Sequence, residues 1–205
     1  MAELLQEFVE DFNYSVVNED TGNGHKKTML RGLFQHGGVR NGNGRVYPRP
    51  ILEKEIQRNI EKIQKKQMLG ELDHPTEGKI HLEKVSHCIT ELKMEPDGKV
   101  MGAVEVFDGS DDEGGTPKGR ILGSLIRRGV QVGISSRGFG SVKQDGDVNE
   151  VQDDFKLITF DIVADPSTPN AYPSAVYEHK ETDGWYEEKK ETNSFLDILN
   201  ENLED

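Results

Sequence analysis

The segment 84–107 constrains the fold most strongly, because it has the pattern of a β-hairpin. Two runs rich in apolar and β-branched residues, Lys84–Met94 and Lys99–Phe107, flank the turn sequence Glu95-Pro96-Asp97-Gly98. Proline presets the backbone angle that such a turn needs, and Asp-Gly tolerates a tight reversal of the chain. We therefore expect an antiparallel sheet built around this hairpin.

Further segments predict both strands and helices. Apolar residues recur at spacings of three and four over Pro50–Gln67 and over Lys118–Arg128, which predicts two amphipathic helices, with Gly70 and Gly129 as the stops. Strands are expected over residues 28–36, 130–142 and 155–165, and the doubled Asn-Gly of residues 41–44 predicts a tight turn. The combined pattern predicts an α+β domain with a mostly antiparallel, barrel-like sheet and flanking helices.

The chain divides into three parts by composition. Residues 1–27 are polar, with one amphipathic patch that predicts a helix at most, and we interpret them as an N-terminal segment or propeptide. Residues 28–177 form the predicted domain. Residues 178–205 form a tail with ten acidic and three basic residues, a net charge of −7 out of −13 for the whole chain. Residues 194–203 of the tail could form a short amphipathic helix that binds a partner.

Composition excludes several classes of function. The net charge of −13 argues against a nucleic-acid-binding surface, which would be basic. With Cys88 as the single cysteine, no intramolecular disulfide can form, which suits a reducing cytosol. The sequence has neither an apolar run of membrane-spanning length nor a signal peptide, so we expect no membrane association.

Two short segments carry the residues that acyl-transfer chemistry needs. Gly-Glu-Leu-Asp-His-Pro, at 70–75, supplies His74 as a candidate base, and Val-Gly-Ile-Ser-Ser-Arg-Gly, at 132–138, supplies the candidate nucleophiles Ser135 and Ser136. No two histidines have the spacing of a helical zinc pair, so no metal or cofactor is expected. Cys88 follows His87 directly in a predicted strand, where neighbours face opposite ways, so we assign Cys88 to the core.

Four segments, taken in order, resemble one known family. They are Asn41–Lys54, Leu69–Pro75, Gly133–Gly138 and Phe155–Ala171, the last containing Pro166-Ser167 and Asn170-Ala171. The chain resembles the prohead core protein proteases of T4-like tailed bacteriophages, serine proteases related in fold to the herpesvirus assembly proteases. The resemblance covers residues 28 to 175 and implies a herpesvirus-protease-like fold.

The resemblance implies a role for each matching residue. His74 matches the general base and Ser135 the nucleophile, with Ser136 as the fallback. For the third member we choose Asp161, because a carboxylate within Phe160-Asp161-Ile162 is costly to bury without a partner; His81 and His87 are the alternatives. Ser136, Arg137 and Gly138 are candidates for the oxyanion or substrate site.

The family cleaves after Glu in a Leu/Ile-x-Glu motif, which implies scaffold, core and major capsid proteins as substrates inside a prohead in the host cytoplasm. Leu5-Gln6-Glu7 and Leu199-Asn200-Glu201 match this motif, so Glu7 and Glu201 are candidate self-cleavage sites of a zymogen. Similarity also suggests a homo-oligomer. Two alternatives stay open: a non-catalytic scaffold or core protein of the prohead, and a non-viral hydrolase, although the α/β-hydrolase motif Gly-x-Ser-x-Gly is absent.

Overall fold

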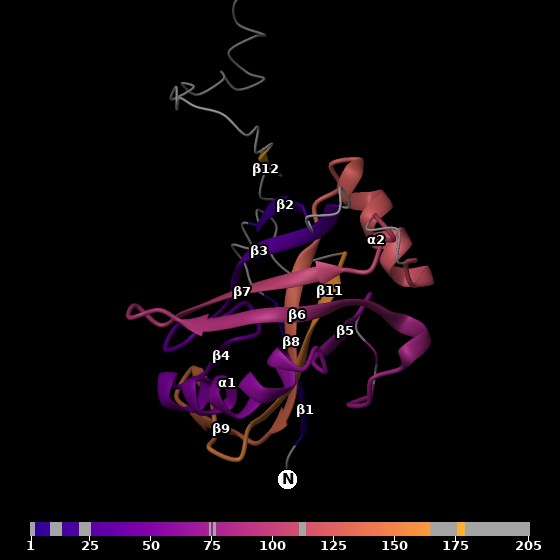
Figure 1. Ribbon diagram of the computed structural model, residues 1–205. Coiled ribbons are helices and arrows are strands. Elements are labelled where there is room, and N and C mark those ends of the chain that lie inside the picture. The colour runs from indigo at the N-terminus through magenta and orange to yellow at the C-terminus, as the bar shows by residue number, and fades with distance from the viewer. Residues whose placement is uncertain are drawn as a thin grey trace, which may run out of the picture.

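The computed structural model is a two-layer α+β structure in which short sheets pack against one another and against two helices (Figure 1). It describes residues 3–8, 14–20, 26–73, 75, 77–110, 114–164 and 176–178. The strands of this part of the chain form three sheets, of six, three and three strands. The expected α+β class is confirmed, but the described strands do not close into a barrel.

The six-stranded sheet contains the hairpin that the sequence predicted. Its strand order is β12-β2-β3-β7-β6-β5. The strands are β2 (Tyr14–Asp20), β3 (Lys26–His36), β5 (Leu69–Glu71), β6 (Val85–Met94), β7 (Lys99–Val106) and β12 (Val176–Glu178). All its pairs are antiparallel except that of β12 with β2. Gly98 closes the β6–β7 turn with a positive φ of 96°, a conformation that glycine adopts without steric cost.

Two three-stranded sheets complete the framework. One has the order β1-β8-β11 and is antiparallel throughout; the other has the order β4-β10-β9. Their strands are β1 (Glu3–Phe8), β8 (Gly133–Gly140), β11 (Lys156–Val163), β4 (Arg45–Val46), β9 (Val142–Asp145) and β10 (Val148–Val151). An isolated parallel bridge between Leu72 and Ile162 joins the end of β5 to β11. The segment that leads to the candidate base therefore runs beside the sheet that carries the candidate nucleophile.

Helices α1 (Arg49–Gln64) and α2 (Pro117–Arg127) begin with proline near the first turn, as helix starts often do, and η1 (Leu82–Lys84) is a single 3-10 turn. Thr116 caps α2 through a 2.9 Å hydrogen bond that its hydroxyl accepts from Gly119 N. Glu55 of α1 is fully buried, and its Oε2 accepts a 2.8 Å hydrogen bond from Leu157 N beside the bulge in β11. This contact fixes α1 against the strand that carries Asp161.

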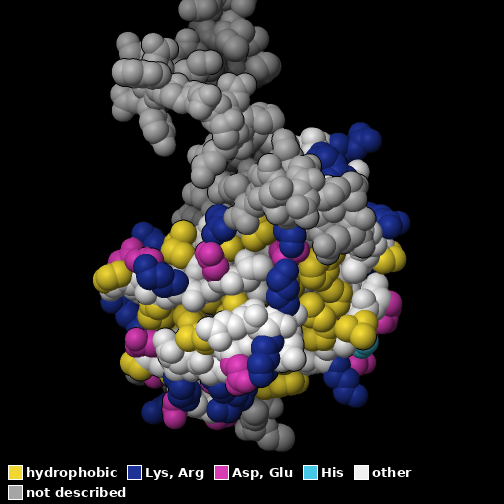
Figure 2. Space-filling view, in the orientation of Figure 1, with side chains coloured by type: hydrophobic (Ala, Val, Ile, Leu, Met, Phe, Trp, Pro, Cys, Tyr) yellow, Lys and Arg dark blue, Asp and Glu magenta, His cyan; other side chains and the backbone are white. Residues whose placement is uncertain are grey.

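One hydrophobic core joins the six-stranded sheet, the β1-β8-β11 sheet and the helices. Phe34 of β3 and Phe160 of β11 meet edge to face at 5.1 Å between ring centroids, so the six-stranded sheet packs directly on the β1-β8-β11 sheet. On the face shown in Figure 2, basic and acidic side chains are interspersed with hydrophobic ones. The acidic excess of the sequence therefore does not gather on this face.

The structure corrects two local expectations. The predicted N-terminal helix is wrong, because Leu4, Leu5 and Phe8 lie in β1. Gly70 does not stop a helix: α1 ends at Gln64, and Gly70 lies within β5. The tail beyond Glu178, including Glu201 and residues 194–203, lies outside the described residues. Neither described helix is long and apolar enough to span a membrane.

Candidate active site

Strand pairing places the candidate nucleophile opposite the candidate third residue. In the antiparallel pair of β8 and β11, Ser135 is the register partner of Asp161, and Ser136 is the partner of Phe160. Because side chains alternate along a strand and direct partners share a face, Ser135 lies on the Asp161 face of the sheet. Ser136 lies on the face of Phe160, where its Oγ is buried and finds no hydrogen-bond partner among the described residues. The two serines therefore have different environments.

Arg137 shares the face of Ser135 and is fully buried. Its Nη2 donates a 3.0 Å hydrogen bond to Asp161 Oδ1, and its Nε lies 2.9 Å from Asp161 Oδ2. Asp161 Oδ1 also accepts a 3.0 Å hydrogen bond from Glu71 N. Asp161 is therefore a buried carboxylate with two partners, rather than an outward-facing residue of a surface strand. Burial of such a charge is tolerated because the guanidinium compensates it.

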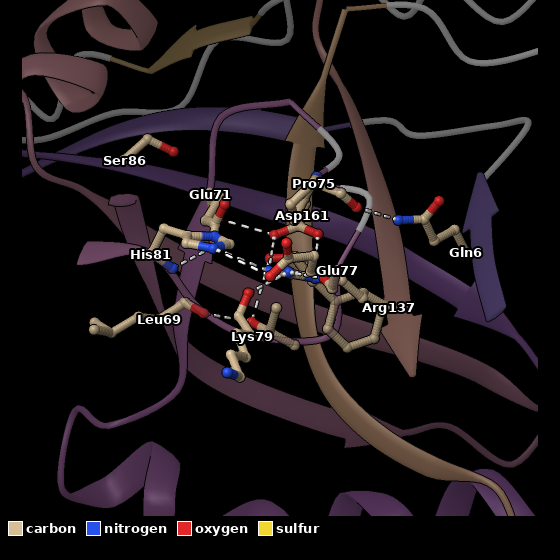
Figure 3. A network of polar contacts seen from close by, with 12 residues as sticks. Gln6, Leu69, Glu71, Pro75, Glu77, Lys79, His81, Ser86, Arg137 and Asp161 are labelled. Atoms are coloured by element: carbon tan, nitrogen blue, oxygen red, sulfur yellow. Dashed lines mark hydrogen bonds and ion pairs between the residues drawn. The ribbon is translucent and has the colours of Figure 1, made fainter. Parts of the chain in front are cut away.

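Arg137 also holds the loop that follows the candidate base (Figure 3). Its Nη1 donates to the carbonyl oxygens of Glu77, at 3.0 Å, and Lys79, at 2.8 Å. Gly78, between them, lies so close to Phe139 of β8 that an added Cβ would be 2.2 Å from the ring. The buried guanidinium thus fastens the loop 77–79 across the face of β8.

Glu71 adds a second buried carboxylate to this network. Its Oε1 accepts a 2.7 Å hydrogen bond from His81 N and lies 3.5 Å from His81 Nδ1 and 3.6 Å from Arg137 Nη2. His81 is partly exposed at the rim of the network. Two carboxylates therefore face one guanidinium, and His81 contacts the outer carboxylate, that of Glu71. Figure 3 shows Glu71, His81, Asp161 and Arg137 gathered around this point.

His74 itself lies outside the described residues, but both of its neighbours are described. Asp73 N donates a 2.8 Å hydrogen bond to Ile162 O of β11, and Pro75 O accepts a 2.9 Å hydrogen bond from Gln6 Nε2 of β1. In the sheet order β1-β8-β11, these two strands lie on either side of β8. The residues on either side of His74 are therefore anchored on opposite sides of the strand that carries Ser135.

The other candidate histidine of this region, His87, lies in β6 and is fully buried. Its Nε2 lies 3.0 Å from Phe160 O, and its Nδ1 lies 2.9 Å from Ser86 Oγ. A carbonyl oxygen only accepts hydrogen bonds, so Nε2 carries the proton and Nδ1 accepts from the serine hydroxyl. Burial lowers the pKa of His87 to about 4, against the smaller opposing effect of the Asp161 charge. Neutral His87 thus bridges two sheets.

Gly70 makes this bridge possible. A Cβ at position 70 would lie 2.1 Å from His87 Nε2 and 2.4 Å from Phe160 O. Only a residue without a side chain lets the imidazole pass over β5 to reach β11. This glycine belongs to the segment that the sequence singled out, but it acts in packing rather than as a helix stop.

Cys88 is buried in the core, as expected. Burial, together with the nearby Glu105 carboxylate, raises the pKa of the Cys88 thiol to about 11. A thiol with that pKa is almost entirely protonated at neutral pH and is a poor nucleophile. Among the described residues, no group of three or more His, Cys, Asp or Glu side chains is arranged to hold a metal ion.

Sequence reasoning singled out Ser135, Ser136, Arg137, Gly138 and Asp161, and the pairing of β8 with β11 brings them together, Gly138 lying opposite Leu157. It missed Glu71 and Gln6. Glu71 had a usable signal, because it is a charged residue between glycine and leucine in a segment already of interest. Gln6 had none, since its contact with Pro75 depends on how β1 pairs with β8.

The sequence and the fold both resemble those of known proteins. Residues 8–181 match the family model described as prohead core protein serine protease. The chain is 36% identical over 149 residues to the prohead core protein protease of Enterobacteria phage T4, covering 70% of this chain and 66% of that protein. The chain thus spans slightly less than two thirds of that relative.

The solved structure of the bacteriophage T4 capsid assembly protease, gp21, superposes with a TM-score of 0.72 at 29% identity. The match covers 80% of this chain and 99% of that one. The observed arrangement of sheets and helices therefore resembles that of the T4 protein.

Proposed function

Because the chain belongs to the prohead core protein serine protease family, we propose that it is a serine endopeptidase that cleaves prohead proteins while a phage head matures. The proposed substrates are scaffold or core proteins and the major capsid protein, cut after Glu in Leu/Ile-x-Glu motifs. The proposed place of action is the interior of the prohead, where the enzyme works as a homo-oligomer and processes itself at Glu7 and Glu201.

One observation carries the proposal: the anchoring of Asp73 and Pro75 on either side of β8. Asp73 is held to β11 and Pro75 to β1, and β8, which carries Ser135, lies between these two strands. Gln6 is the register partner of Arg137, so it shares the face of Arg137 and Ser135 and binds Pro75 from that face. This topology suits a histidine that removes the proton from the Ser135 hydroxyl.

The proposed chemistry is that of a serine nucleophile with a histidine base. Ser135 Oγ attacks the scissile carbonyl carbon, His74 accepts the hydroxyl proton and then donates it to the leaving amine, and water hydrolyses the acyl-enzyme. Asp161 is the proposed third residue. The ion pair with Arg137 holds the Asp161 carboxylate opposite Ser135, and Nη1 of the same guanidinium binds the loop 77–79. Backbone N–H groups of residues 136–138 are the proposed oxyanion donors.

The test is active-site labelling with a fluorophosphonate probe together with cleavage of a Leu-x-Glu peptide. Ser135→Ala and Ser136→Ala are the matched pair, because both remove one hydroxyl from neighbouring positions of β8. We expect the wild type and Ser136→Ala to be labelled and to cleave the peptide, and Ser135→Ala to lose at least a thousandfold in rate. Retained labelling of Ser135→Ala would assign the nucleophile elsewhere.

The same assay is run on the chain alone and on assembled prohead cores, so that an enzyme active only after assembly is also detected. Incubation of Ser135→Ala beside the wild type tests self-processing. Terminal fragments that end at Glu7 or Glu201 are expected from the wild type alone, and identical fragments from both proteins contradict self-cleavage.

A further inference from the structure

The segment between β5 and β6 forms a loop whose two ends lie close together. β5 ends at Glu71, and β6 begins at Val85, which is the register partner of Glu71. Leu72 N donates a 3.2 Å hydrogen bond to Lys84 O, which closes the loop beside this pair. Compact loops with adjacent ends often carry functional residues. This loop contains His74, the proposed general base.

Glu71 joins the two ends of the His74 loop, which we define as residues 72–81. The Glu71 side chain is fully buried, and its Oε1 accepts a 2.7 Å hydrogen bond from His81 N, at the far end of the loop. The same oxygen lies 3.5 Å from His81 Nδ1 and 3.6 Å from Arg137 Nη2 (Figure 3). One carboxylate oxygen therefore contacts both the far end of the loop and the guanidinium that binds its middle part.

Asp73, the residue before His74, has a backbone conformation that is unusual for a residue with a side chain. Its φ is 73°, in the left-handed region that favours glycine. Such conformations persist where surrounding contacts enforce them, and they cluster at active sites. Here Asp73 N donates a 2.8 Å hydrogen bond to Ile162 O, and Leu72 forms a parallel bridge with Ile162. The chain therefore bends at a fixed point directly before His74.

Few apolar side chains hold the His74 loop. Of its described residues only Pro75 is buried, while Leu72 is half-buried and Asp73, Glu77 and Lys79 are exposed. The position of the loop therefore depends largely on polar contacts with buried groups, and such contacts are directional. We expect the loss of one of them to let the loop move while the hydrophobic core stays packed.

We propose that Glu71 is a positioning residue for catalysis, whose buried carboxylate fastens the end of the loop at His81 and thereby keeps His74 within reach of Ser135. A general base has to lie within hydrogen-bond distance of the proton that it removes, and a misplacement of about 1 Å costs roughly a hundredfold in rate. Glu71 acts through the loop and does not touch the reacting atoms. The inference rests on the proposed function, to which it adds the residue that supports the base.

The test compares two buried glutamates in the full chain. Glu71 and Glu55 are both fully buried, and each accepts a hydrogen bond from a distant backbone N–H, that of His81 or that of Leu157. Glu71 contacts the His74 loop, whereas Glu55 connects α1 with β11. Glu71→Ala and Glu55→Ala therefore remove the same atoms at different places. Urea unfolding identifies the conditions under which both variants are folded.

Hydrogen exchange of the backbone amides, measured by mass spectrometry on peptides that cover residues 72–81, reports directly how firmly the loop is held. We expect Glu71→Ala to speed exchange in this segment by about tenfold, and Glu55→Ala to change it by less than about twofold. This measurement needs neither substrate nor activity. Unchanged exchange of the loop in folded Glu71→Ala would overturn the inference.

Cleavage of a Leu-x-Glu peptide, on the chain alone and on assembled cores, measures the effect on the reaction. We expect kcat of Glu71→Ala to fall by about a hundredfold with KM within about threefold of the wild type, because the loop holds the base and not the substrate. Glu55→Ala should keep kcat within about threefold. A raised KM with unchanged kcat, or equal losses of kcat in the two variants, would contradict a positioning role.

Conservative variants provide a second test at the same position. Glu71→Gln keeps an acceptor oxygen at the same reach, so we expect its kcat to exceed that of Glu71→Ala by about tenfold. If Glu71→Ala does not fold, Glu71→Asp takes its place, because it keeps the charge but shortens the reach by one methylene group. A kcat of Glu71→Gln as low as that of the shortened variant would count against the hydrogen bond to His81 N as the positioning contact.

Failure of the proposed function gives a different result from failure of this inference. A wild type that cleaves no peptide and takes up no fluorophosphonate, with faster loop exchange in Glu71→Ala, would contradict the assigned activity and leave the hold of Glu71 on the loop supported. An active wild type, with faster loop exchange but full activity in Glu71→Ala, would overturn the positioning role and leave the assigned activity intact.

Discussion

Asp161 stands directly opposite Ser135, yet the charge of Asp161 is already matched by Arg137, whose Nε is 2.9 Å from Asp161 Oδ2. The carboxylate proposed to complete the catalytic group is therefore also half of a buried ion pair. Substitution at Asp161 will affect stability as well as chemistry, and the two effects have to be separated by measurement.

Asp161→Asn should destabilise the protein by about 3 kcal/mol, because it leaves the buried guanidinium of Arg137 without its main partner. The double variant Asp161→Asn with Arg137→Met should cost less than the sum of the two single changes, since the unpaired charge is gone. Urea unfolding at neutral pH gives the free energy of unfolding of the two single variants and the double variant. As a control, Glu95→Gln breaks the exposed pair with Lys93 and should cost less than about 0.5 kcal/mol. Strictly additive costs at Asp161 and Arg137 would show that the pair is not energetically coupled.

Gly70→Ala should destabilise the protein by about 3 kcal/mol or more, because the new methyl group would overlap both His87 Nε2, at 2.1 Å, and the backbone oxygen of Phe160, at 2.4 Å. Gly129→Ala is the control: no atom lies within 4 Å of its added Cβ, and its positive φ of 75° alone should cost about 1 kcal/mol. The comparison is made by thermal or urea unfolding. Similar costs at the two positions would mean that β5 and β11 are not in close contact.

The burial of His87 predicts a loss of stability in mild acid. Its folded pKa, about 4, lies below the unfolded value of about 6.5, so the unfolded chain takes up a proton first as the pH falls. The stability that neutral His87 contributes is complete above pH 6.5 and is lost as the pH falls toward 4. The loss amounts to about 2 kcal/mol at pH 5. Urea unfolding at pH 7.5 and pH 5 should show a smaller drop for His87→Gln than for the wild type. Equal drops would indicate that His87 is accessible to protons in the folded state.

Cys88 should react slowly with iodoacetamide in the folded protein. The rise of its pKa from 9.0 to about 11 lowers the thiolate fraction at pH 8 by about a hundredfold, and burial adds a steric barrier. Mass spectrometry of timed samples, with the urea-unfolded chain as the reference, gives the two rates. A folded rate within tenfold of the unfolded rate would contradict a core position for this residue.

Local signals in the sequence predicted most of the central elements. The β6–β7 hairpin was predicted by Pro96-Asp97-Gly98, and both helices by their apolar spacing, because these signals depend on neighbours in the chain. The N-terminal strands were not predicted. β1 and β2 are strands through pairing with β8 and β3, and a short polar segment gives no local sign of a distant partner.

In the candidate site, too, features that depend on neighbours in the chain were predicted, and features that depend on distant segments were not. The alternation of side chains along β8 correctly placed Ser135 and Ser136 on opposite faces of the sheet. The cost of burying Asp161 correctly predicted that its carboxylate has a partner. The partner that the structure shows is Arg137, whereas the sequence had suggested a histidine. The network of Arg137 with Glu71 and the carbonyls of residues 77 and 79 depends on the crossing of three segments. Residue types alone do not specify such a crossing, and the role of His74 stays a prediction.

The pairing of β1 with β8 also has a consequence for how the protein is made. Strand β1 leaves the ribosome well before its partner β8, which is synthesised only after most of the domain, at about 5–20 residues per second. Such long-range contacts form late in folding. When β8 emerges, β1 is already present on the same chain, ahead of any other polypeptide. A newly synthesised molecule would therefore have the edge beside Ser135 covered by its own chain before another polypeptide could pair with it.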